Sequence, residues 1–318
     1  MTTVADSRLP LPLPWQLSLW DSLMARIEQQ KLPHALLLNA TEGIGVERLV
    51  AALIGRLICL SPENNYACGH CKACQLLQAG THPDVLPITP EEQGKAIKIQ
   101  QIRELCAALE KTSQQGGWKV TVISPVEAMN IAAANALLKN LEEPQDRTLM
   151  ILVSHRSGLL PATIRSRCQI ENIPVPDRNS ALEWLNEVAG NNDKNSQILD
   201  MAGGRPLLAL QYLQGDGIEE REHVESLLEA IRHGEVTACD AAQQCQKYDA
   251  DQAIGWAMSY LHRIATSELQ DDPNIALFNF SGKLNTARGW VLSGSNINTQ
   301  LLWEELFIEW SQVFHPRK

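Results

Sequence analysis

The stretch KVTVISPVEAMNIAAANALLKNLEEPQDRTLMILVSHRSGLLPATIRSRC, residues 119 to 168, decides the fold. Residues 119 to 124 are rich in β-branched side chains and stop at a proline, which is typical of a buried strand. Residues 130 to 143 repeat apolar side chains at helical spacing up to Pro144. Residues 148 to 154 form a second strand that is apolar on both faces. This order predicts a β-α-β unit in a parallel sheet.

A short basic turn, residues 159 to 168, follows the second strand and carries Arg165 and Arg167. Open α/β sheets keep their chemistry in loops beyond the strand ends. We therefore expect these arginines on a loop just past a strand, with Arg167 as a candidate functional residue. The alternative for Arg167 is a salt bridge that closes the turn.

A glycine turn lies upstream, between a predicted strand at residues 34 to 40 and a predicted helix that ends near Ile58. This is the frame of a phosphate-binding loop, which needs Lys and Ser/Thr where the helix begins. Gly43 and Gly45 are present, but Val46 stands at the lysine position and Glu47 at the Ser/Thr position. The cation is lost, and a negative charge stands at the helix N-terminus. We expect no productive ATP binding; a plain turn that happens to contain glycine is the alternative.

The end of the first strand shows a matching change. An active NTPase carries acidic residues there, which hold Mg²⁺ and act on water. This chain has Ser124 and Pro125 instead, and Glu127 stands two residues further on as a shifted carboxylate.

Four cysteines, Cys59, Cys68, Cys71 and Cys74, have the spacing C-x8-C-x2-C-x2-C. Four converging thiolates close a structural Zn²⁺ site with no position left for water. In a cytosolic chain this spacing favours a metal over a disulfide. A redox CxxC pair and buried free thiols are the alternatives. His70 is expected to be exposed to solvent.

Length and charge limit the class of protein. The 318 residues suggest two or three domains, and 44% hydrophobic residues suffice for real cores. A net charge of −10 argues against a broad basic face that grips nucleic acid. No apolar run or N-terminal signal predicts membrane insertion or export, so we expect a cytoplasmic protein.

Three regions are predicted along the chain. Residues 1 to 172 form the α/β domain with the degenerate phosphate loop and the cysteines, and a Pro-rich linker follows at residues 173 to 177. Three short helices are expected over residues 173 to 215, where Arg205 is expected to cap a helix or form a surface ion pair. Residues 216 to 318 are predicted to be all-helical.

A resemblance to a known family rests on NALLKNLEEP, residues 135 to 144, followed by Ser166, Arg167 and Cys168. These motifs resemble the core of subunits of the bacterial DNA polymerase III clamp loader, a branch of the AAA+ ATPases. The resemblance implies a RecA-like AAA+ domain with an inserted zinc module, a small helical lid and a helical collar through which subunits join a ring.

The resemblance also implies a function. A subunit with this defective loop would not hydrolyse ATP, and Arg167 would reach into a neighbouring subunit's ATP site as an arginine finger. The chain would be an accessory subunit of a DNA-directed DNA polymerase. Its partners would be ATPase subunits of the gamma/tau type, a delta-type subunit, the sliding clamp and, through the complex, primer-template DNA, with no membrane. An active AAA+ ATPase subunit and a zinc-dependent DNA-binding protein are the alternatives. The resemblance also places Arg205 near the nucleotide-sensing arginine of active members, and a retained sensing role is the alternative for that residue.

Overall fold

The computed structural model describes residues 9–92, 94–215, 217–268, 275–292 and 297–315. The chain divides into two compact units, Met1–Leu210 and Gln211–Lys318.

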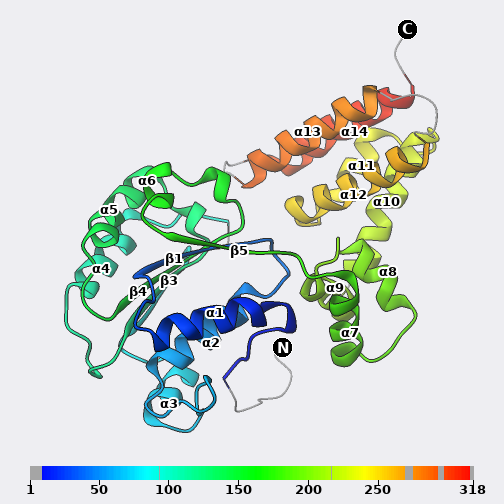
Figure 1. The fold of residues 1–318 in the computed structure, drawn as a ribbon. Coiled ribbons are helices and arrows are strands. Elements are labelled where there is room, and N and C mark those ends of the chain that lie inside the picture. Colours follow the sequence, from blue (N-terminus) through cyan, green and yellow to red (C-terminus); the bar gives the residue numbers. More distant parts are fainter. Residues whose placement is uncertain (1–8, 93, 216, 269–274, 293–296, 316–318) are drawn as a thin grey trace. The chain divides into compact units, whose positions relative to one another are not determined.

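A five-stranded sheet with the order β2-β3-β4-β1-β5 forms the centre of the first unit (Figure 1). All neighbouring strands run parallel. This confirms the predicted fold class, because β4 is buried along its whole length between two other strands. The strands are β1 (Ala35–Ala40), β2 (Val85–Ile88), β3 (Lys119–Ile123), β4 (Thr148–Ser154) and β5 (Gln169–Ile173).

Helices cover both faces of this sheet (Figure 1). One apolar cluster joins α1 and α2 to the sheet, and a second joins α4 and α5 to its other face. The helices are α1 (Leu17–Glu28), α2 (Val46–Ile58), α3 (Lys72–Gln78), α4 (Ile99–Leu109), α5 (Ile131–Glu142) and α6 (Ala162–Arg165), with single 3-10 turns η1 (Pro14–Gln16), η2 (Val126–Ala128) and η3 (Ser157–Leu159).

The basic turn differs from its prediction in two ways. Arg165 ends the short helix α6 rather than lying in a loop. Strand β5 was not predicted, and it begins at Gln169, which pairs with Leu36 near the start of β1. Arg167 therefore precedes β5 at the amino edge of the sheet, whereas the sequence interpretation placed it beyond a strand's carboxyl end. The polar sequence of β5 suits an edge strand, in which several side chains face solvent.

Three short helices follow β5, as predicted: α7 (Arg178–Ala189), α8 (Lys194–Met201) and α9 (Pro206–Gln214). The boundary between the two compact units falls inside α9, after Leu210. The Asp177 carboxylate caps α7 by accepting hydrogen bonds from two backbone N–H groups of its first turn.

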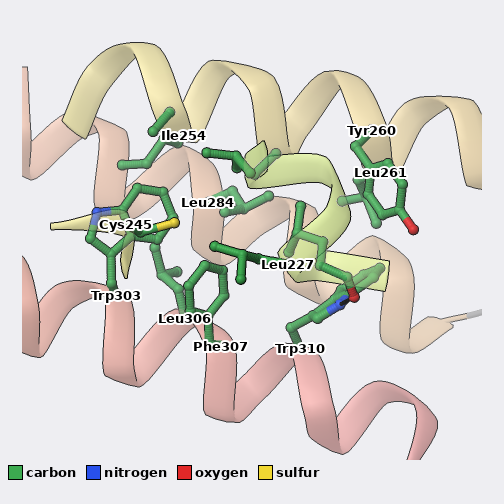
Figure 2. Packing of buried hydrophobic residues seen from close by; sticks show 14 of the residues in the cluster. Leu227, Cys245, Ile254, Tyr260, Leu261, Leu284, Trp303, Leu306, Phe307 and Trp310 are labelled. Atoms are coloured by element: carbon green, nitrogen blue, oxygen red, sulfur yellow. Dashed lines mark hydrogen bonds between the residues drawn. The ribbon is translucent and has the colours of Figure 1, made fainter. Parts of the chain in front are cut away.

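The second unit is helical throughout its described residues and has a core rich in aromatic side chains. Trp303, Phe307 and Trp310 of the last helix point into the cluster that Figure 2 shows. The buried Trp310 indole donates to the carbonyl of Leu228 at 2.8 Å, which meets its need for a partner. Its helices are α10 (Gly217–Arg232), α11 (Ala238–Cys245), α12 (Ala250–Glu268), α13 (Ile275–Leu292) and α14 (Thr299–Phe314).

The buried side chain of Asp84 holds the loop before β3 in place. Its carboxylate, 1% exposed, accepts hydrogen bonds from the backbone of Gln114 at 2.7 Å and Gln115 at 2.8 Å. These bonds fix the loop that leads into β3.

Among the described helices, none is long and apolar enough to cross a membrane.

Candidate functional site

The glycine turn connects β1 to α2 and places its lysine-position residue in the core. Gly43 and Gly45 have φ angles of 84° and 80°, a left-handed conformation that favours glycine. Helix α2 begins at Val46, whose side chain is buried in the apolar cluster beneath the sheet. Glu47 is exposed on the first turn of the helix. The positions that would hold phosphate and Mg²⁺ thus carry a core hydrocarbon and an acid.

Hydrogen bonds from the same unit hold the backbone of this turn. The Trp15 indole donates to the carbonyl of Ile44 at 2.9 Å, and the Gln16 amide donates to the carbonyl of Gly45 at 2.8 Å. From α9, the backbone N–H of Leu207 donates to the carbonyl of Gly43 at 3.0 Å. The turn is therefore tied to the segment before α1 and to the first residues of α9.

Leucine side chains lie directly against the turn. A Cβ atom at Gly43 would come within 2.9 Å of the Leu208 Cβ, and one at Gly45 within 2.4 Å of the Leu13 Cδ1. Leu13 is itself fully buried. Moving an anion out of water and into contact with hydrocarbon raises its free energy. This packing therefore disfavours phosphate at the turn.

Trp15 and Gln16 are residues that sequence reasoning missed. Gln16 is 1% exposed, and its side-chain oxygen accepts from the backbone of Leu13 at 2.9 Å. The Trp15 ring packs edge-on against Trp184 of α7, with ring centroids 5.6 Å apart. Trp15 and Gln16 each lie 29 residues from the carbonyl that they bind, and no local sequence pattern indicates contacts over such a distance.

The acidic residue that follows β3, Glu127, binds the backbone beyond β4 through one of its oxygens. Ser124 and Pro125 follow the strand, as the sequence showed, and Glu127 lies in η2. One Glu127 oxygen accepts from the backbone of His155 at 2.9 Å, while the other is buried without a hydrogen-bond partner in the structure. The His155 ring bonds to the carbonyl of Ala40 at 2.8 Å. One oxygen of the shifted carboxylate is therefore hydrogen-bonded to the backbone beyond β4.

Arg167 lies at the opposite edge of the sheet and contacts its own chain. Its Nε and Nη2 atoms approach the same Glu142 oxygen at 2.7 and 2.5 Å, and Nη1 donates to the carbonyl of Thr163 at 3.0 Å. The arginine side chain is one third exposed and the glutamate half exposed. The salt bridge that the sequence left as an alternative is therefore present, and Arg167 remains at the surface. Arg165 is exposed nearby on α6.

The four predicted cysteines come together at the end of α2 and the start of α3. Their sulfur atoms all lie within 4.8 Å of one another, and Cys59 lies 3.5 Å from Cys68 and 4.0 Å from Cys71. A tetrahedral zinc ion with bonds of ~2.3 Å separates its sulfur ligands by about 3.8 Å. The donor set therefore fits one tetrahedral ion, and it could hold zinc.

The environment of this cluster suits thiolates only in part. A hydrogen bond from the backbone N–H of His70 lowers the pKa of Cys68 to about 6. Burial raises the pKa of Cys59 and of Cys74. A cation would be needed to keep the buried pair ionised. The His70 side chain is exposed, as predicted.

Arg205 stands just before α9. Its Nε donates to the carbonyl of Ala202 at 2.8 Å, and Ala202 ends α8. This is the helix-capping interaction that the sequence predicted.

Comparisons with known proteins agree on one family. The family described as "DNA polymerase III, delta subunit" matches residues 15–177. The chain is similar to "DNA polymerase III subunit delta'" of Pseudomonas aeruginosa, with 34% identity over 326 aligned positions that cover 95% of this chain and 98% of that protein. The protein of the same description from Escherichia coli is 37% identical over 210 residues, which cover 66% of this chain and 63% of that protein.

A solved structure extends the likeness to the fold. The crystal structure of a DNA polymerase III gamma subunit-related protein from Thermotoga maritima aligns with a TM-score of 0.55. The alignment covers 92% of this chain and 98% of that one at 19% identity. At this identity the likeness concerns the fold alone.

Proposed function

The chain belongs to the delta-prime subunit family of the DNA polymerase III clamp loader, and from this premise we propose that it neither binds nor hydrolyses ATP. One observation carries the proposal: leucine side chains and hydrogen bonds of the same unit cover the glycine turn. Val46 and Glu47 remove the cation and the Mg²⁺ ligand from the same place.

Calorimetric titration of the purified chain with Mg²⁺-ATP tests this proposal. We expect no saturable heat of binding at micromolar to millimolar ATP, because the turn offers no lysine and is packed against hydrocarbon. An ATPase subunit of the loader, titrated in the same buffer, is the positive control. Saturable micromolar binding by this chain would disprove the proposal.

The role proposed for Arg167 is an arginine finger that acts on a neighbouring subunit. The glycine turn follows β1 at the carboxyl edge of the sheet, whereas Arg167 precedes β5 at the amino edge. The six residues of β1 separate these edges by about 20 Å. Arg167 therefore cannot reach a nucleotide at its own turn, and its side chain is accessible to another subunit.

We propose that the subunits repeat one contact head to tail, so that the carboxyl edge of a neighbouring subunit's sheet faces the amino edge of this one. In that arrangement Arg167 would meet the γ-phosphate of an ATP held by an ATPase subunit of the gamma/tau type. The positive guanidinium group would stabilise the negative charge that builds up on the phosphate oxygens in the transition state.

The remaining partners and domain roles follow from the same family membership. We propose that residues 1–172 form the AAA+ domain, 173–215 the lid and 216–318 the collar that joins the ring. Exposed apolar side chains of α13, Ile275 and Phe278, support a contact surface in the last region. The delta-type subunit, the sliding clamp and primer-template DNA would be met within the assembled loader.

We propose a structural zinc ion at Cys59, Cys68, Cys71 and Cys74. The ion would supply folding free energy to the segment between α2 and α3, and four thiolates would leave it no open position for catalysis.

A further inference from the structure

The guanidinium group of Arg167 has a partner on its own chain at every nitrogen. Nε and Nη2 share Oε1 of Glu142, while Nη1 reaches the carbonyl of Thr163 and, at 3.3 Å, the hydroxyl of Ser166. The Nε–Nη2 edge is one that can bind two oxygens of a phosphate or carboxylate. A phosphate approaching this edge therefore has to replace Glu142.

Glu142 stands where a carboxylate is not favoured locally. It is the last residue of α5, and the C-terminus of a helix carries a partial negative charge that repels an acid. The neighbouring Leu141 is buried, and its carbonyl bonds to the ring of His34 at 2.9 Å, so the end of α5 is held in place. An acid in this position is unfavourable for the helix, and its contact is with Arg167.

We propose that Glu142 is a positioning residue that holds Arg167 in a resting position until the γ-phosphate of a neighbouring subunit replaces it. This inference rests on the proposed finger role of Arg167. Ion pairs with this degree of exposure are weak, so the exchange needs little free energy. The pair lowers the fraction of free arginine by about fivefold at most, and the affinity of the finger for phosphate falls in proportion.

The test uses the reconstituted loader with Glu142→Gln in this subunit. Without clamp and DNA, basal hydrolysis at the ATP site that receives Arg167 should rise by up to about fivefold, because the arginine is released from its competitor. The basal rate of the whole loader should rise by a smaller factor, since the other sites do not use this arginine. With clamp and DNA, the rate should stay near the wild-type value, since the finger is then already engaged. Adding Arg167→Ala to Glu142→Gln should remove the rise.

Glu110→Gln is the matched control. The Glu110 carboxylate, at the end of α4, pairs with Lys139 at 3.3 Å and not with Arg167. Lys139 lies on α5, the helix that also carries Glu142. This variant loses the same charge and breaks an exposed ion pair, yet should leave the basal rate unchanged.

NMR of the isolated chain gives a second readout. The Arg167 Nε–H resonance should shift, and its exchange with water should become faster, in Glu142→Gln but not in Glu110→Gln. No change in this resonance would overturn the proposal at the level of the ion pair.

The outcomes separate the two claims. If Arg167→Ala lowers the ATPase rate but Glu142→Gln leaves the basal rate unchanged or lowers it, the finger stands and the resting position is wrong. If neither variant changes any rate, the finger role itself is wrong.

Discussion

Two turns at opposite edges of one sheet differ in how much of a nucleotide site each of them carries. The glycine turn after β1 has lost its lysine and is covered by Leu13, Gln16 and the first residues of α9. The turn before β5 keeps the Ser-Arg-Cys sequence and leaves Arg167 at the surface. A site that hydrolyses ATP with an arginine finger from another subunit needs both a loop that binds phosphate and that arginine, so one subunit can lack the first part and still supply the second.

The difference between the turns is also one of energy. The glycine turn is fixed by buried hydrogen bonds and apolar contacts, which are costly to remove. The arginine turn is held by an exposed ion pair, which is weak.

Arg167→Ala should have the largest effect, and on rate rather than on folding. At the ATP site that receives this arginine, hydrolysis should fall by ~10³-fold or more, as with arginine fingers of other NTPases. The DNA- and clamp-stimulated ATPase of the whole loader should fall only partly, because the other sites take arginines from other subunits. Arg167→Lys should rescue poorly, since a point charge lacks the two-pronged geometry.

Arg165→Ala is the control for this measurement. It removes the same charge two residues away on α6, where the side chain is exposed, and should leave the stimulated rate near wild type. Normal assembly and a wild-type rate in Arg167→Ala would make Arg167 a purely structural residue.

Cys71→Ser tests a part of the first unit that belongs to neither turn. Loss of one thiolate should reduce bound zinc from one ion per chain to near zero, because a closed site needs all four ligands. The segment from Cys59 to Gly80 should then exchange its amide hydrogens faster, while the sheet stays protected. Elemental analysis and hydrogen exchange measure the two effects.

The exposed Cys239 of α11 supplies the matched control, since it is far in sequence from the cluster and is not one of its members. Cys239→Ser should retain the ion and the protection. Wild-type protein prepared without chelators that contains no metal would contradict the zinc site.

The covering of the glycine turn can be weakened directly with Gln16→Ala. The change leaves the buried N–H of Leu13 without its partner, and it takes one of two donors from the carbonyl of Gly45, which still accepts from the backbone N–H of Arg48 at 3.1 Å. At roughly 1–3 kcal/mol for a buried group left without a partner, we expect the free energy of unfolding to fall by about 1–3 kcal/mol. The amide of Leu207, which donates to Gly43, should exchange faster.

Gln29→Ala provides the comparison for this variant, because Gln29 is exposed at the end of α1. Its effect should stay within ~0.5 kcal/mol in urea unfolding. Equal effects of the two variants would show that Gln16 does not hold the turn.

Much of the fold could be predicted because apolar periodicity survives in the elements that form the core. Strand β4 begins and ends at the residues expected for it, since every one of its side chains is buried. Strand β5 was missed because it is an edge strand with the sequence QIENI, which lacks an apolar face. Without β5, the sequence placed Arg167 at the wrong edge of the sheet.

The candidate sites could be predicted as far as they depend on short spacing. The four cysteines lie within sixteen residues, and their spacing alone indicated that they converge. The contacts of Gln16 with Gly45 and of Glu142 with Arg167 join residues 29 and 25 positions apart. Such pairs depend on how the elements pack, which no local pattern reports.

The smallest effect is expected when the missing phosphate-loop residues are restored. Restoring the phosphate-loop residues with Val46→Lys and Glu47→Thr supplies the missing cation and Mg²⁺ ligand. We nevertheless expect no ATP turnover, because Ser124 and Pro125 leave the metal without an acidic ligand at the end of β3. ATP binding should also stay below detection, since Leu13 still packs against the turn.

Adding Leu13→Ala to this pair separates the two causes. If packing blocks the turn, the triple variant should bind ATP measurably in calorimetry while the double variant does not, and neither should hydrolyse it. If the double variant alone binds ATP at micromolar concentration, residue identity rather than packing inactivates the turn. The packing around the glycine turn would then not be what prevents ATP binding, and the energetic difference drawn between the glycine turn and the arginine turn would be wrong.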